Sequence, residues 1–567
     1  MKAKIMVAAL AAAILIARDA GAFHGNSTAA STRLQGRAYS QFLSGYLHYR
    51  DGDLDAALES YRKALRYQEN EPAILFEVAN VLVKKGKLPE ARQYLEQALA
   101  IDGNHARSRY LLAGILAATG DREKAISLYA RTVSDNPDIE EAYVHLSTLH
   151  AEKGEFGKAE EYLNTLIGRN PESFLAYYYR GRILAAQDKF DAALSDFDQS
   201  LSIHPAFEGA LIDSGGILEL MGRHGEAEER YKKALVLNPR NPAVRERLGR
   251  VLILEKKIDK AVDQYEELKR FSSGNLDFRT RLGLLYLDRD RYDDAINEFL
   301  FVLAAKPENS RVRFFLGTAY EEKGLFAEAE KEFRAIPDSS PVYRDAMLHL
   351  AMTLGRRERI DDAIGVTEKL REKFPDDVQL LIFLGTQLEE AKRYQEALAV
   401  LTEAVQKEPK NASGRFSLGV IYDKLGDLDK LISSMEKAIE LDPEHATAMN
   451  YLGYTYADRN MRLEEAESLI LRALEIRPDD GYFIDSLAWV YYRMGDYQRA
   501  EAEIRRSLSF IPDDPIILEH MGDILSGEGK KEEAAVYYEK AISHGHEKPE
   551  EIKGKLNRIQ KAGSTAK

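Results

Sequence analysis

Apolar side chains recur along this chain at the period of an α-helix, in runs separated by glycine, proline or short polar segments. The stretch GDLDAALESYRKAL (52–65) shows the pattern, with alanine and larger apolar residues interleaved with charged ones. Stepping forward by 34 residues finds the same arrangement after Gly86, Gly120 and Gly154. Apolar residues at this spacing predict amphipathic helices, and their return predicts one structural unit repeated along the chain.

The repeat covers most of the chain. Fifteen units run in phase from Ala38 to Lys548 with a period of 34 residues. One unit has 35 residues because an extra residue falls near Met461. A period of this length indicates a stack of helical hairpins rather than separate globular domains.

Small residues recur at fixed positions of the unit. The eighth position is glycine in ten units and alanine in four, with Ser147 in the remaining one. The twentieth is alanine in every unit except one, which has Leu431, and the thirty-second is proline in eleven. Each unit is therefore predicted to form two antiparallel helices, with glycine or a polar residue at the turn and proline at the junction with the next unit.

One such helix pair cannot bury its apolar stripe alone, so neighbouring units must stack. Small residues at positions 8 and 20 let the two helices approach closely, because protein interiors are close-packed. The large residues at position 24 are expected to fill the space between units; examples are Tyr61, Tyr231, Phe299 and Tyr538.

This pattern closely resembles the tetratricopeptide repeat. The resemblance implies an all-α, right-handed superhelix (an α-solenoid) of fifteen helix pairs with a concave groove. The predicted organisation is a signal peptide at 1–22, a flexible lead-in at 23–37, units 1–9 at 38–343, units 10–15 at 344–548, and a capping helix and tail at 549–567.

Three segments depart from the regular unit. Pro337 lies inside an expected second helix and should end it early, which makes 337–343 a candidate kink. The segment 271–275 (FSSGN) replaces the usual proline turn. After the last unit, a short helix with Ile552, Leu556 and Ile559 on one face is expected to cap the array.

The N-terminus carries the three regions of a secretory signal peptide. Two lysines precede the apolar run Ile5–Ala17, and Ala20-Gly21-Ala22 supplies small residues for cleavage. The run is shorter than the roughly 20 apolar residues that span a bilayer. We expect export to the periplasm and cleavage near Ala22; an uncleaved anchor and a wrongly assigned start site are the alternatives.

Composition narrows the function. The net charge of -14 opposes phosphate backbones and anionic lipid, so the chain is not expected to bind nucleic acid. It contains no cysteine, which excludes disulfides, a thiol nucleophile and the lipidated cysteine of a lipoprotein anchor. Partner proteins or peptides are the expected ligands.

No motif points to catalysis or to a cofactor. The segment 522–531 (GDILSGEGKK) lacks the ending of a phosphate loop and falls in a repeat turn. The segment 544–547 (HGHE) is read as an exposed loop rather than a metal site, and Asp513-Asp514 as helix N-cap residues. The chain is expected to be no enzyme and to hold no cofactor and no metal.

The resemblance implies that positions 2, 5, 9, 12 and 13 of each unit line the concave groove. Aromatic and arginine side chains at such positions anchor interfaces, although the same rings can pack between helices instead. The candidate partner-binding residues are Tyr39, Phe42, Tyr46, Tyr49, Asn450, Tyr454, Asp458, Tyr482, Asp485, Trp489, Tyr492 and Arg493.

The stretch 452–501 resembles the C-terminal repeats of proteobacterial envelope adaptor lipoproteins that partner a carboxyl-terminal processing protease. The resemblance implies a non-enzymatic scaffold or adaptor in the periplasm, including an adaptor for an envelope protease. The alternative is a structural assembly factor for exopolysaccharide or pilus export across the outer membrane. An enzyme such as a glycosyltransferase lacks room for a catalytic domain here, and a cytoplasmic regulator requires that the signal peptide assignment be wrong.

Overall fold

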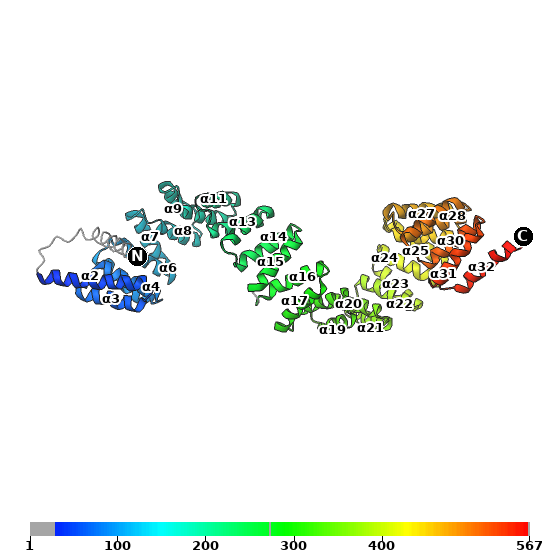
Figure 1. Ribbon diagram of the computed structural model, residues 1–567, viewed down its shortest axis with the longest axis horizontal. Coiled ribbons are helices and arrows are strands. Elements are labelled where there is room, and N and C mark those ends of the chain that lie inside the picture. The colour runs from blue at the N-terminus through cyan, green and yellow to red at the C-terminus, as the bar shows by residue number, and fades with distance from the viewer. Residues whose placement is uncertain (1–28, 272–273, 565–567) are drawn as a thin grey trace. The chain divides into compact units, whose positions relative to one another are not determined.

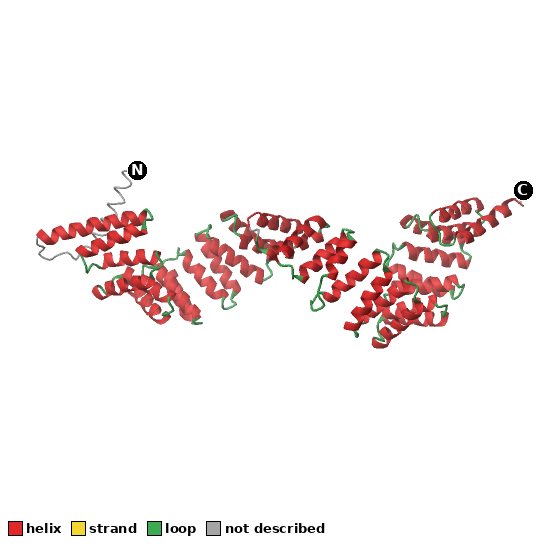
Figure 2. Cartoon of the chain, turned by 90° about the horizontal axis from the view of Figure 1, so that it is seen from below, coloured by secondary structure: helices red, strands yellow, loops and turns green. Residues whose placement is uncertain are grey.

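The computed structural model describes residues 29–271 and 274–564, which fold entirely into helices and connecting loops (Figures 1 and 2). The predicted signal peptide lies outside these residues. The chain divides into two compact units, the first ending at Phe278 and the second beginning at Arg279. Among the described residues, no helix combines the length and the apolar character needed to cross a bilayer.

The described helices form fifteen pairs and one final helix. The first helices of the pairs are α2 (Ala29–Arg50), α4 (Pro72–Lys84), α6 (Ala106–Ala118), α8 (Glu140–Glu152), α10 (Phe174–Ala185), α12 (Glu208–Leu220), α14 (Pro242–Leu254), α16 (Leu276–Asp288), α18 (Ser310–Glu322), α20 (Tyr343–Arg356), α22 (Val378–Glu390), α24 (Ala412–Lys424), α26 (Ala446–Asp458), α28 (Gly481–Met494) and α30 (Pro515–Gly527).

The second helices are α3 (Leu54–Tyr67), α5 (Leu88–Ile101), α7 (Arg122–Asp135), α9 (Phe156–Arg169), α11 (Phe190–Ile203), α13 (His224–Leu237), α15 (Ile258–Phe271), α17 (Tyr292–Ala305), α19 (Phe326–Arg334), α21 (Ile360–Lys373), α23 (Tyr394–Lys407), α25 (Leu428–Leu441), α27 (Leu463–Ile476), α29 (Tyr497–Phe510) and α31 (Lys531–Ser543), and α32 (Pro549–Ser564) ends the chain. The predicted all-α solenoid of fifteen helix pairs and a final helix is confirmed.

The turn inside each pair has one backbone geometry. Position 15 lies in the left-handed region in all fifteen units, with glycine in nine (φ between 71° and 91°) and another residue in six (φ between 55° and 59°). Glycine reaches this region without the steric penalty that a Cβ brings. The extra residue of the long unit is accommodated in its turn, where Asn460 and Arg462 both have positive φ.

The glycines at position 8 mark where the two helices of a pair touch. A Cβ placed on Gly215 would lie 2.6 Å from the Tyr231 ring, and one on Gly283 would lie 2.5 Å from the Phe299 ring. The predicted close approach is therefore present. The position-24 rings do not fill only the space between units, as expected from the sequence, because each packs on the position-8 residue of its own pair.

Pro337 shortens its helix as predicted. Helix α19 ends at Arg334 after nine residues, whereas the other second helices have 13 or 14. The predicted division of the array at 343/344 remains a prediction. The boundary between the two compact units falls beside the other interruption, the segment 271–275.

The two ends of the array differ from the regular unit. Residues 29–37, which the sequence assigned to a flexible lead-in, form the first turns of α2. At the other end, α32 buries Ile552 and partly buries Leu556 and Ile559, which is the capping face predicted from the sequence. Two surfaces of the terminal helix pairs thus receive extra helix.

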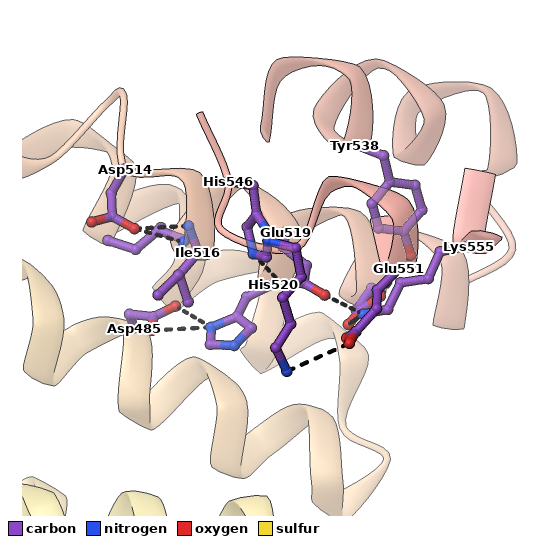
Figure 3. Close-up of polar contacts among 12 residues, drawn as sticks. Asp485, Asp514, Ile516, Glu519, His520, Tyr538, His546, Glu551 and Lys555 are labelled. Carbon is purple, nitrogen blue, oxygen red and sulfur yellow. Dashed lines mark hydrogen bonds and ion pairs between the residues drawn. The ribbon is translucent and has the colours of Figure 1, made fainter. Parts of the chain in front are cut away.

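Replacing Asp514 by alanine is expected to lower the stability of the C-terminal repeats by about 1 kcal/mol. The Asp514 carboxylate caps α30 by accepting hydrogen bonds from the backbone N–H groups of Ile516 (2.9 Å) and Ile517 (3.1 Å), as Figure 3 shows. Urea unfolding measures the loss. Asp513→Ala is the matched control, because the exposed Asp513 carboxylate makes no cap and contacts only His544 at 3.4 Å. Equal losses in both variants would contradict the capping role.

Candidate functional site

Four rings gather where the first helices of units 13, 14 and 15 adjoin. Trp489 on α28 stacks on His520 of α30, with ring centroids 4.2 Å apart and planes 21° apart. Tyr492 stacks on the same indole at 4.8 Å, and Tyr454 on α26 lies 6.4 Å from the His520 ring. We call Tyr454, Trp489, Tyr492 and His520 the aromatic cluster. It joins three consecutive units through their first helices.

A buried ion pair supports the aromatic cluster. The Nδ1 atom of His520 lies 2.9 Å and 3.0 Å from the two carboxylate oxygens of Asp485, and both side chains are buried (Figure 3). Burial by itself would lower the pKa of His520, but the carboxylates of Asp485, Asp523 and Glu519 outweigh it and raise the pKa. The imidazole is therefore held toward its charged form beneath the indole.

A second set of charges ties the capping helix to unit 15. The Lys555 ammonium on α32 donates hydrogen bonds to the carboxylates of Glu519 (2.6 Å) and Asp523. His546 Nε2 lies 2.8 Å from Glu519, and the Tyr538 hydroxyl donates to Asp523 at 2.6 Å (Figure 3). Burial would raise the pKa of Glu519, but Lys555 lowers it further than burial raises it. These contacts place α32 on the groove positions of the last unit.

The predicted partner-binding residues divide into accessible and buried ones. Tyr482 is 56% exposed, Tyr39 44% and Tyr46 39%, whereas Asp485 and Trp489 are only 6% and 7% exposed. The other members are the exposed Asp458 and the half-buried Phe42, Tyr49, Asn450, Tyr454, Tyr492 and Arg493. Asp485 and Trp489 thus offer little surface to a partner, and their contacts hold α28 against α30.

Two groove atoms are buried and unsatisfied. Among the described residues, Asn450 Oδ1 and Trp489 Nε1 have no hydrogen-bond partner. A buried polar group without a partner costs free energy that a partner's polar group can recover. The acceptor and the donor lie on adjacent first helices, α26 and α28, at positions 5 and 9 of their units.

The candidate residues of unit 1 lie on α2. Phe42 packs against Tyr61 of the same pair, with ring centroids 5.4 Å apart. The Tyr49 hydroxyl accepts a hydrogen bond from the Asn80 amide at 3.2 Å, and the Lys84 ammonium lies 4.3 Å from the centre of the Tyr49 ring. Phe42 and Tyr49 therefore support the helix packing, while Tyr39 and Tyr46 remain accessible.

A hollow of about 450 Å³ between α6 and α8 was missed by sequence reasoning. Its walls include Tyr110 and Tyr129 on one side and His145 and Thr148 on the other. We call it the α6–α8 hollow. The search for large aromatic residues could not find it, because it exists where groove side chains are small. The signal in the sequence was glycine at position 9 of unit 3, followed by alanine at position 12.

The two segments weighed for cofactor or metal binding have structural contacts. In the described part of the chain, no group of three or more histidine and acidic side chains is arranged to hold a metal ion. His544 and His546 instead pair with Asp513 (3.4 Å) and Glu519 (2.8 Å). The segment 522–531 forms the end of α30 and the turn that follows it.

Models of the tetratricopeptide repeat match along most of the chain. One matches residues 48–115 and 82–145, and a second matches 146–206, 221–275 and 280–343. A third matches residues 344–546 continuously. The matched ranges include both compact units.

Similar proteins share short stretches or the repeat fold. A tetratricopeptide repeat-containing protein of Pseudomonas aeruginosa, PA4667, is 43% identical over 74 residues, which are 13% of this chain and 12% of that protein. Mouse tetratricopeptide repeat protein 21A is 30% identical over 94 residues, 17% of this chain and 7% of that protein. The crystal structure of the APC/C hetero-tetramer Cut9–Hcn1 covers 88% of this chain and 98% of its own, at 16% identity and a TM-score of 0.36. The chain aligns with about a tenth of these two relatives, so nothing about their whole activity transfers.

Proposed function

Because this chain belongs to the tetratricopeptide repeat family, we propose that it is a non-enzymatic scaffold of the bacterial periplasm that holds partner proteins on its first helices. The observation that carries this proposal is the exposure of Tyr39, Tyr46 and Tyr482, three large side chains at groove positions. Exposed tyrosines at such positions bury much area at low entropic cost when a partner binds. The two unsatisfied atoms Asn450 Oδ1 and Trp489 Nε1 add polar contacts on the same helix faces.

Within this function, we propose that the C-terminal repeats serve as an adaptor for an envelope protease. Support comes from the resemblance of residues 452–501 to the repeats of envelope adaptor lipoproteins. The aromatic cluster and the Asp485–His520 pair make this end of the array a rigid support for an interface. Rigid surfaces lose less conformational entropy on binding.

Photo-crosslinking in bacterial cells tests the groove. With p-benzoylphenylalanine in place of Tyr482, we expect covalent adducts with one or a few envelope proteins, because this side chain is 56% exposed on a first helix. Mass spectrometry of the adducts identifies the partner. Val536 provides the matched control, since it is 49% exposed on the second helix α31 of the neighbouring unit.

The adducts separate the alternatives. A protease captured at Tyr482 and not at Val536 supports the adaptor function, and an outer-membrane export component supports an assembly factor instead. The same adducts from both positions, or none from either, would contradict a partner-binding groove.

Export is expected to remove the N-terminal segment. Because Ala20-Gly21-Ala22 follows the apolar run Ile5–Ala17, the mature chain should begin near Phe23. Intact-mass measurement of the chain purified from the periplasmic fraction checks this. A full-length chain recovered from the cytosol would refute both export and the periplasmic location, and Ala22→Arg should block the cleavage.

A further inference from the structure

The α6–α8 hollow has the features of a side-chain pocket within the scaffold surface. Its floor and walls are aromatic: the Tyr110 and Tyr129 rings lie 5.7 Å apart, and the His145 ring stacks on Tyr129 at 5.5 Å with planes 23° apart. Tyr129 is buried, while Tyr110 and His145 reach solvent. Ring faces of this kind line a space that is open at one side.

The hollow stays empty because two groove positions have almost no side chain. Gly114 and Ala117 occupy positions 9 and 12 of unit 3, and both line the hollow. In other units, position 9 holds residues as large as Arg182, Met352 and Tyr454. A Cβ on Gly114 would meet only the Tyr129 hydroxyl, at 3.3 Å. The space is therefore a consequence of residue choice and not of the repeat fold.

The charges around the hollow favour a cation. At its mouth, Glu152 pairs with Arg122 at 3.4 Å, so these two charges compensate each other. Glu141 lies one turn before His145 on α8, and no cation of the described residues lies within 4 Å of its carboxylate. The neighbouring rings desolvate His145 and lower its pKa, although part of the side chain reaches solvent. At neutral pH, an uncharged imidazole leaves the hollow with one uncompensated negative charge.

We propose that the α6–α8 hollow receives the arginine side chain of a partner segment. A planar guanidinium can stack on the Tyr110 and His145 rings and approach the Glu141 carboxylate at the same time. The chain already uses such contacts internally, since the Arg107 guanidinium lies 4.9 Å from the centre of the Phe76 ring. The net charge of -14 attracts basic segments toward the chain as a whole. This inference rests on the proposed scaffold function and adds the chemistry of one contact.

Nine-residue peptide libraries with a fixed central residue test the proposal on the full-length chain. We expect the chain to retain the central-arginine library about tenfold better than the central-citrulline library, which has the same shape without the charge. Gly114→Met fills the hollow and should remove this preference. Glu141→Gln should reduce it severalfold while leaving the space open.

The controls separate the pocket from the rest of the groove. Thr386→Met makes a similar change at position 9 of unit 11 and should leave the arginine preference unchanged. Circular dichroism confirms that each variant folds, and Glu141→Gln keeps the test valid if Gly114→Met does not. Equal retention of arginine and citrulline, a preference for a central phenylalanine, or a preference that survives both variants would overturn the proposal. Crosslinking at Tyr482 tests the scaffold function independently, because that residue lies in the other compact unit.

Discussion

Gly522→Ala is expected to destabilise the C-terminal repeats by about 1–3 kcal/mol, the usual cost of overpacking a tight interior. A Cβ on Gly522 would lie 2.5 Å from the Tyr538 ring. That ring cannot move aside easily, because it is 2% exposed and its hydroxyl donates to Asp523 at 2.6 Å. The helix propensity of alanine recovers about 1 kcal/mol at most, so the net change is a loss.

Trp489 is the only tryptophan of the chain and lies on the neighbouring first helix, so its fluorescence during urea unfolding reports on this region. Gly554→Ala is the matched control: it is also a helical glycine of the C-terminal region, but a Cβ there meets nothing within 4 Å. It should be neutral or slightly stabilising. Adding Tyr538→Ile to Gly522→Ala recreates the Ala488–Ile504 combination of unit 14 and should recover part of the loss. Equal unfolding midpoints for the two single alanine variants would refute the close-approach argument.

The repeat could be predicted from the sequence because its constraints recur in phase. A left-handed residue at position 15 and a small residue at position 8 are needed in every unit, so both appear as a comb in the sequence. The early end of α19 followed from Pro337 alone, since proline disrupts a helix locally. Features that depend on one residue and its own helix were therefore readable.

Contacts between units were harder to predict, although some also recur. Lys85, Lys153 and Lys323 each occupy position 14 of a unit and pair with an acidic residue at position 18 of the unit before. A periodic search for opposite charges 30 residues apart would have found them. The Asp485–His520 pair has no such counterpart along the chain, because it joins position 5 of one unit to position 6 of the next.

The candidate site could be placed but not resolved into its parts. The resemblance puts Tyr482, Asp485 and Trp489 on one groove face, yet only the first is exposed. Exposure depends on whether the next first helix brings a large ring over that position, and His520 does so for Trp489. The α6–α8 hollow arises from absent side chains, which a search for reactive or bulky residues passes over.

Asp485→Ala is expected to cost about 3–5 kcal/mol, because it leaves the buried, positively charged His520 without its partner. The same urea unfolding, followed through Trp489, measures it. Asp479→Ala on the exposed loop before α28 is the control and should change stability by less than about 0.5 kcal/mol. Equal midpoints for the two variants would mean that the ion pair contributes nothing.

The pH dependence gives this pair a second, independent test. Because the folded state raises the pKa of His520 above its unfolded value, folding is favoured fully below the unfolded value of about 6.5, and this gain disappears as pH rises through the folded pKa. The C-terminal repeats should therefore be more stable at pH 6 than at pH 8. Asp485→Asn keeps a hydrogen-bond acceptor but removes the charge that raises the pKa, so this difference should shrink. A charged imidazole stacked 4.2 Å from the indole also quenches its emission, so Trp489 fluorescence should rise with pH in the wild type. In Asp485→Asn the rise should move to lower pH, and an unshifted titration would show that Asp485 does not control the charge of His520.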